Sequence, residues 1–180
     1  MFRNTEHTYV SVDGSRRDRI AYAGDLDIAR AAALASTHGL EFVQGTLELF
    51  ASVQATPGFF VSTVKKHQEP LPTPLDVNIT GLIGYSWNLL TAFSQTYMHT
   101  GDLALASEWA PRIVRMLDWS HSQTLDSGLF NLSDTSFGGD WNYYDPAQSE
   151  VVIKFNVLYA YALQETVGLL ADAVVDVSMY

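Results

Sequence analysis

The chain has 180 residues, long enough for one sizeable hydrophobic core, and 47% of them are hydrophobic while only 17% are charged. Its 20 acidic and 10 basic residues give a formal charge of −10, which argues against nucleic acid and anionic membranes as partners, because both require a basic surface. It has no cysteine, which excludes disulfides and thiolate chemistry and leaves the redox compartment open. The sequence contains no run of eighteen apolar residues, so no membrane-spanning helix is predicted. No apolar signal core is visible, and the localisation stays unknown.

The N-terminal part of the chain predicts an extended lead-in followed by a helix. Residues 1–12 are expected to be extended, because polar and apolar residues alternate near their end as in a strand. A helix with an alanine-rich face is predicted over 26–38. Asp25 or Asp27 is well placed to cap its start, and Gly39 to end it.

Two further helices are expected on either side of a long irregular segment. The first covers 40–54, where apolar residues recur at helical spacing, and its short connection to the preceding helix predicts a hairpin. Several prolines interrupt 55–79, which is therefore predicted to be a long loop of the kind that often carries function. The helix predicted over 81–99 is apolar almost all round, which indicates burial on most sides.

The C-terminal half predicts two more helical stretches and a second long loop. Gly101-Asp102 starts a helix, with Asp102 as its cap, and a fresh helical segment is predicted over 111–122, because proline fits best at a first helical position. A loop rich in small polar residues is expected over 123–145 and a last helix over 147–173. About five to six helices arranged as hairpins predict an all-α fold without a fixed-period repeat.

One stretch, 13–25, concentrates three carboxylates and three arginines in a chain that is otherwise sparing with charge. Glycines near both of its ends predict turns, so the stretch is expected to be a charged loop leading into a helix start. It can be a solvated turn held by exposed Asp–Arg pairs, each worth about 0–1 kcal/mol. It can equally be an acid–base site in which one carboxyl stays protonated and another stays ionised. The charges alone leave both interpretations open.

The order Asp13-x4-Asp18-x6-Asp25, with Arg17 before the middle acid, resembles the signature of the family 78 α-L-rhamnosidases, particularly its fungal version Asp-Gly-x-Lys/Arg-Arg-Asp-Arg. Members of this family are inverting glycosidases built on an (α/α)6 toroid, the six-hairpin fold. The resemblance implies that Asp18 is the general acid, a position usually held by Glu. It also implies that Asp13 and Asp25 bind the substrate and that Arg17 orients them.

The resemblance continues over nearly the whole chain. It is carried by four further segments: Tyr85-Ser86-Trp87, Tyr97-Met98-His99-Thr100-Gly101-Asp102, Gly128-Leu129-Phe130 with Gly139-Asp140-Trp141, and Lys154-Phe155-Asn156-Val157-Leu158-Tyr159. It implies that Trp87 forms an aromatic wall against the sugar, although core packing stays the alternative for a tryptophan on an apolar helix. Asp140 and Trp141 suit a carbohydrate, because sugars present apolar C–H faces and polar edges.

The resemblance also implies a division of the chain and a substrate class. Residues 1–25 would form the extended run-in and the charged motif loop, and 26–180 the N-terminal part of an (α/α)6 catalytic domain, a partial toroid and hence truncated. The expected partners are a carbohydrate substrate and the missing remainder of the catalytic domain. The alternative is a non-catalytic helical module that binds a glycan or a protein on its concave face.

An inverting glycosidase needs an acid and a base about 6.5–9.5 Å apart on opposite faces of the sugar. In the family the base is a glutamate on a late helix, and no equivalent context occurs in this chain, although Glu150 and Glu165 stay possible in principle. Little or no hydrolysis is therefore expected from the chain alone. No metal and no cofactor are predicted, because the five histidines lack metal-ligand spacing and Gly138-Gly139 lacks the lysine of a phosphate loop.

Overall fold

The computed structural model describes residues 2–3, 9–12, 20–64, 82–139, 147–176 and 178. Helices dominate this part of the chain: α1 (Ala23–Ser36), α2 (Leu40–Ser52), α4 (Ile83–Thr100), α5 (Leu103–Ser122), α6 (Ile153–Asp172) and a short 3-10 helix, η1 (Thr135–Phe137). The strands have two residues each. β1 (Phe2–Arg3) pairs antiparallel with β2 (Tyr9–Val10), and β3 (Ala21–Tyr22) pairs antiparallel with β4 (Thr63–Val64). The predicted all-α class is confirmed.

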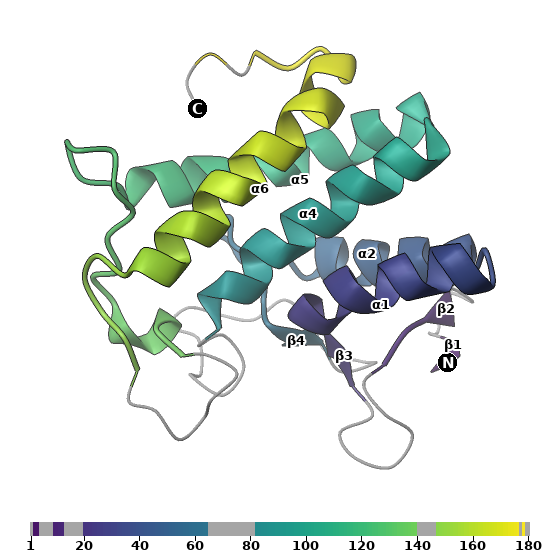
Figure 1. The fold of residues 1–180 in the computed structure, drawn as a ribbon, viewed down its shortest axis with the longest axis horizontal. Coiled ribbons are helices and arrows are strands. Elements are labelled where there is room, and N and C mark those ends of the chain that lie inside the picture. The colour runs from purple at the N-terminus through teal and green to yellow at the C-terminus, as the bar shows by residue number, and fades with distance from the viewer. Residues whose placement is uncertain are drawn as a thin grey trace.

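The helices form two layers. In Figure 1, α1, α4 and α6 lie side by side and run in the same direction, and we call them the front layer; α2 and α5 pack behind them and run the opposite way. At the end where the front-layer helices finish, the connections to the rear layer are short, 37–39 and 101–102. At the other end the connections are the much longer segments 53–82 and 123–152. Long connections carry binding residues more often than tight turns do, so this second end is the place to look for a site.

Helix α4 is the centre of the hydrophobic core. Twelve of its 18 residues are buried, which confirms the prediction of a helix covered on most sides. Trp87 packs edge-on against Phe130, with ring centroids 4.9 Å apart, and Phe93 packs edge-on against Trp109 at 5.1 Å. None of the described helices is long and apolar enough to cross a membrane.

Helix α1 begins and ends differently from the prediction. Its N-cap is Tyr22, whose side chain makes no capping hydrogen bond, so the helix starts before Asp25 and Asp27. The start is fixed instead from outside the helix, because the backbone N–H of Ala23 donates to the carbonyl of Ser62 at 2.9 Å. At the other end the left-handed residue is His38, at φ 52°, whereas Gly39 is the N-cap of α2.

Helix α5 runs through Pro111 without a break, contrary to the prediction of a new segment there. A proline inside a helix removes one backbone hydrogen bond. Both Pro111 and Ser107, whose carbonyl loses that bond, are exposed, so water can replace it. The predicted cap is confirmed, because the carboxylate of Asp102 accepts hydrogen bonds from the backbone N–H groups of Ala104, at 2.9 Å, and Leu105, at 3.3 Å.

Helix α6 starts at Ile153, later than predicted. Before it, Glu150 adopts a left-handed conformation at φ 65° and pairs antiparallel with Leu132, through hydrogen bonds of 2.8 and 2.9 Å in the two directions. Its apolar residues also split between two sides. Phe155, Ala162 and Leu170 are buried, whereas Val167 is 49% exposed.

Candidate functional site

The starts of α1 and α4 are joined by one extended segment, 60–64. Strand β4 of this segment pairs with β3, which leads directly into α1. The hydroxyl of Ser86, in the first turn of α4, donates to the carbonyl of Phe60 at 2.6 Å. We call this end of the front layer the entry end, because the front-layer helices begin there.

The entry end also includes the segments that lead into α6. Leu82, the N-cap of α4, forms an antiparallel bridge with Gly138, and the N–H of Gln148 donates to the carbonyl of Gly138 at 2.9 Å. The side chain of Asn156 in α6 pairs with the backbone of Phe130, accepting from its N–H at 2.8 Å and donating to its carbonyl at 3.1 Å. Segments far apart in the sequence therefore meet at one end of the fold.

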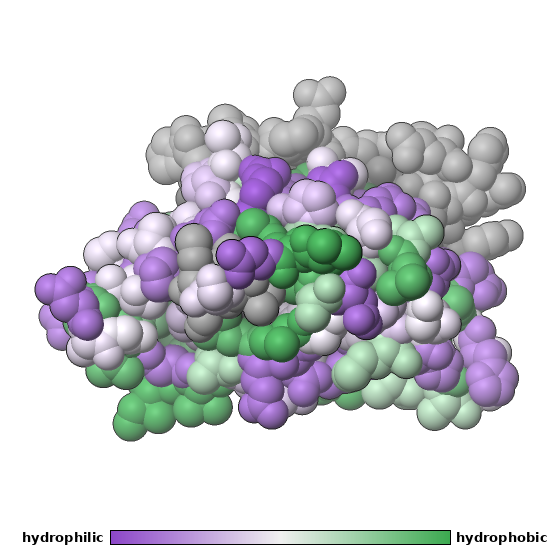
Figure 2. Space-filling view, turned by 90° about the horizontal axis from the view of Figure 1, so that it is seen from above, coloured by the Kyte–Doolittle hydropathy of each residue, from purple (hydrophilic) through white to green (hydrophobic). Residues whose placement is uncertain are grey.

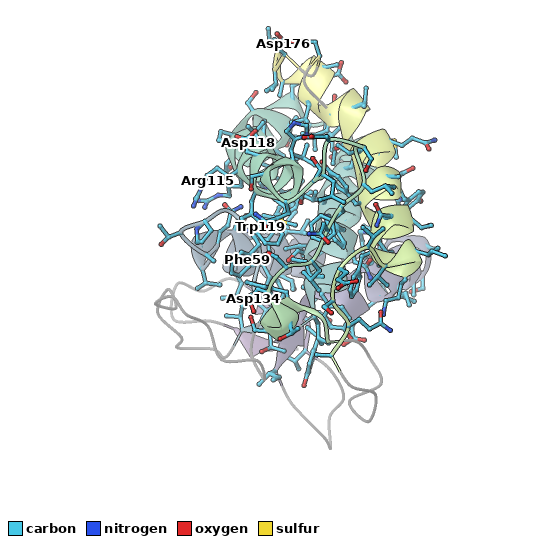
Figure 3. The ribbon with its side chains drawn as sticks, turned by 90° about the vertical axis from the view of Figure 1, so that its left-hand side faces the viewer. Phe59, Arg115, Asp118, Trp119, Asp134 and Asp176 are labelled. Atoms are coloured by element: carbon cyan, nitrogen blue, oxygen red, sulfur yellow. The ribbon has the colours of Figure 1, made fainter. Side chains whose placement is uncertain are left out.

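An aromatic cluster supports the segment that leads towards Asp140. The ring of Phe59 lies edge-on to Trp119 and to Phe137, with centroids 5.2 and 4.9 Å away, and Phe59 and Trp119 lie on the side shown in Figure 3. Asp134 caps η1 by accepting a hydrogen bond from the N–H of Ser136 at 2.9 Å. The spacing of Asp134 and Ser136 is a known turn signal, so this cap was visible in the sequence.

Gly24 lets α4 approach α1 closely at the entry end. A Cβ added at Gly24 would lie 2.5 Å from the ring of Tyr85, which is itself buried. Real Cβ atoms do not approach other atoms so closely, so any larger residue would push the two helix starts apart.

We expect Gly24→Ala to lower the free energy of unfolding by about 1–3 kcal/mol, because overpacking outweighs the higher helix propensity of alanine. The matched control is Gly168→Ala in α6, where an added Cβ meets nothing within 4 Å. This control should be neutral or should stabilise the protein by up to about 1 kcal/mol. Urea unfolding followed by circular dichroism measures both; equal effects would show that Gly24 is not required for the approach.

The structure places only part of the predicted site. Asp25 lies half-buried in the first turn of α1, where the helix dipole favours a carboxylate. Most of the other predicted residues lie outside the described residues: Asp13, Arg17, Asp18, Asp140 and Trp141. The described residues nearest to them in the sequence, Ile20 and Gly139, adjoin β3 and the bridge at Gly138, which belong to the entry end.

Trp87 has the core-packing role and not the sugar-contacting one. It is fully buried, and its indole N–H donates to the hydroxyl of Ser120 at 3.0 Å. Its ring is surrounded by those of Phe130, Phe155 and Tyr159. A side chain on the inward face of the central helix leaves no ring surface for a ligand, so the aromatic wall implied for Trp87 is corrected.

Polar side chains from all three front-layer helices form a second group, which we call the polar cluster. Arg30 of α1 donates through Nη2 to the side-chain oxygen of Gln95 in α4 at 2.5 Å. The amide nitrogen of Gln95 donates to Glu165 of α6 at 2.8 Å and to the hydroxyl of Tyr161 at 3.3 Å. Asp27 completes the group, with Oδ1 3.4 Å from Arg30 Nη2.

Burial dominates the electrostatics of the polar cluster. It raises the pKa of Asp27; the Arg30 guanidinium opposes this rise, and the Glu165 carboxylate adds to it. Outside the cluster, burial also raises the pKa of Tyr159, whose ring lies beside Trp87, to about 12, so this phenol stays protonated at neutral pH. Within the described ranges, no three His, Cys, Asp or Glu side chains lie close enough together to hold a metal ion.

No protein-family profile matches the chain, and no curated protein matches it in sequence. Solved structures do match its fold. A crystal structure of a GH78 family rhamnosidase from Bacillus sp. GL1 superposes with a TM-score of 0.70 over 91% of this chain, at 21% identity. A rhamnosidase from Klebsiella oxytoca with rhamnose bound gives 0.67 over 88%, at 20% identity.

The chain has the fold of the GH78 rhamnosidases. The predicted fold class, a partial (α/α)6 toroid, is thereby confirmed. The chain corresponds to 16% of the length of the Bacillus rhamnosidase chain and 29% of that of the Klebsiella one. The chain therefore spans less than a third of the length of either rhamnosidase.

Sequence reasoning did not find the polar cluster. Asp27 and Arg30 are three residues apart and Tyr161 and Glu165 four apart, so each pair was recognisable as sharing a helix face. That the two pairs meet across Gln95 depends on α1 and α6 flanking α4, which no local pattern specifies.

Proposed function

We propose that the chain is a glycoside hydrolase-like protein of the α-L-rhamnosidase type, which binds a terminal α-L-rhamnoside at the entry end. One observation carries the proposal: the segments that adjoin the charged motif and the Asp140–Trp141 motif are tied to the same end of three parallel helices. The resemblance of those motifs and the likeness to the rhamnosidase fold support it independently.

Each motif residue has a role in this proposal. Asp18 is the general acid, which protonates the glycosidic oxygen as the bond breaks. Asp13 and Asp25 stay ionised and accept hydrogen bonds from the sugar hydroxyls, and Arg17 orients them. Asp140 and Trp141 contact the sugar, the ring against its C–H face and the carboxylate at its polar edge. In inversion a separate base activates the water, and we assign no residue of this chain to that task.

The test combines turnover with binding. We expect the purified chain to bind methyl α-L-rhamnoside and to hydrolyse p-nitrophenyl α-L-rhamnoside little or not at all, because no residue of the chain is assigned as the base. Asp18→Asn is compared with Asp126→Asn, an exposed acid in the 123–152 segment. Turnover that only Asp18→Asn abolishes would establish the acid and show that the chain contains a base. A folded chain without binding would contradict the proposal.

A second candidate is a non-catalytic helical module that binds a partner on its open face. The observation in its favour is the row of exposed apolar residues on α6, with Ile153 82%, Val157 60% and Val167 49% exposed. Seen from the side of α5 and α6, hydrophobic patches interrupt the hydrophilic surface (Figure 2). A folded chain that neither binds nor hydrolyses rhamnosides would favour this candidate.

A further inference from the structure

We propose that the polar cluster of Asp27, Arg30, Gln95, Tyr161 and Glu165 is a binding site for a neutral sugar unit, separate from the acids of the motif loop. The inference rests on the proposed function in one respect, namely that the ligand is a carbohydrate. The choice of site rests on the contacts and burial of these five side chains.

The first argument is an unused donor on a buried arginine. Arg30 is 7% exposed, and its Nη2 makes hydrogen bonds to the backbone and carboxylate oxygens of Asp27 and to Gln95. Its Nε is buried and has no hydrogen-bond partner among the described residues. A buried donor without a partner destabilises a fold, so each such case calls for an explanation such as a ligand.

The second argument is that the cluster is poorly built as a purely structural ion pair. Asp27 meets Arg30 through one long contact of 3.4 Å instead of two parallel bonds. Burial outweighs that arginine in setting the pKa of Asp27. A half-satisfied polar network stabilises a core less than apolar packing would, so stability alone does not account for these residue types.

The third argument is the match between the cluster and a sugar. Two carboxyl groups accept hydrogen bonds from hydroxyls, while a guanidinium donates to hydroxyl oxygens. Tyr161 beside them is 44% exposed, and its aromatic ring can offer an apolar face to C–H groups. The cluster therefore brings a hydrogen-bond donor, acceptors and an aromatic face from three helices close together.

The position of the cluster separates it from the entry end. Gln95 follows Tyr85 by ten residues in α4, which corresponds to about 15 Å along the helix axis. From Ile83 to Gln95, the positions of α4 that are not buried, Gly84, Asn88 and Gln95, recur at helical spacing on one face. This row of small and polar residues connects the entry end with the cluster along the front layer.

The direct test is to titrate the full chain with methyl α-L-rhamnoside and follow side-chain N–H resonances by NMR. The Nε–H of Arg30 and the amide of Gln95 should shift on binding. Shifts confined to the motif loop, 13–25, would support the proposed function and overturn this inference. Shifts confined to the cluster would support this inference and overturn the proposal that the rhamnoside binds at the entry end. A titration without any shift would overturn both proposals.

A matched pair of variants gives a second readout. Glu165→Gln keeps an oxygen that can accept from Gln95 but removes a charge-assisted acceptor, so the affinity measured at the cluster resonances should fall about tenfold. Glu108→Gln, at an exposed acid on α5, should leave it unchanged. Unchanged affinity in both variants, with Arg30 Nε–H insensitive to the sugar, identifies the cluster as a structural network only.

Discussion

Replacing Trp87 by alanine is expected to lower the free energy of unfolding by about 3–5 kcal/mol, the range for emptying a large buried aromatic site. Trp87 is 0% exposed at the centre of α4. Three aromatic rings surround it, and the hydroxyl of Ser120 accepts from its indole nitrogen at 3.0 Å. Such a cavity has no route to collapse without moving α4, α6 and the Phe130 segment together. Urea unfolding monitored by circular dichroism measures the loss.

Two companion variants separate packing from ligand contact. Ser120→Ala leaves the indole N–H buried without its acceptor and should destabilise the protein by about 1–3 kcal/mol. Trp87→Phe keeps an aromatic ring in the site and should fall between wild type and Trp87→Ala in stability. Rhamnoside binding per folded molecule should survive both changes. A stable Trp87→Phe protein that has lost binding would reinstate the sugar-contacting role.

The helices were predictable because their signal is local. The spacing of Val43, Leu47 and Phe50 specifies the buried side of α2, whichever helix packs against it. The continuous apolar surface of α4 likewise predicts a central position, and Asp102 after Gly101 predicts a cap. These features need only the residues within a few positions along the chain.

Helix boundaries failed where a distant segment decides them. Helix α1 starts at Ala23 because Ser62 accepts its N–H, and α6 starts late because Leu132 pairs with Glu150. In both cases a hydrogen bond from another part of the chain competes with the local helical preference. The polar cluster escaped prediction for a similar reason, since its members come from three helices whose order in space is a property of the fold.

The site residues were predictable only through the motif that contains them. Asp25 occurs at the entry end as part of that motif, and its charge pattern alone left a solvated turn equally open. Trp87 shows the limit of carrying a role over by resemblance. The resemblance singles the residue out, but its burial gives it a packing role.

Gly138→Ala is expected to destabilise the entry end by about 3 kcal/mol, combining overpacking with a lost backbone hydrogen bond. A Cβ at this position would lie 1.7 Å from the carbonyl oxygen of Gln148, a backbone atom that no side-chain rotation can move. The φ angle of Gly138, −79°, is ordinary for any residue, so the whole effect is steric. Relief requires opening the pairing of Gly138 with Gln148, and with it the bridge to Leu82.

The matched control is Gly128→Ala in the preceding loop. Gly128 has φ 81° and open space around an added Cβ, so alanine there brings only the strain of a left-handed conformation, about 1–2 kcal/mol. Hydrogen exchange at the Gln148 amide distinguishes the two variants, because only Gly138→Ala should remove its protection. Since Asp140 and Trp141 follow Gly138 by only two and three residues, the same variant should weaken binding of methyl α-L-rhamnoside, whereas Gly128→Ala should spare it. Equal protection of Gln148 in both variants would mean that the pairing at Gly138 does not hold the entry end together.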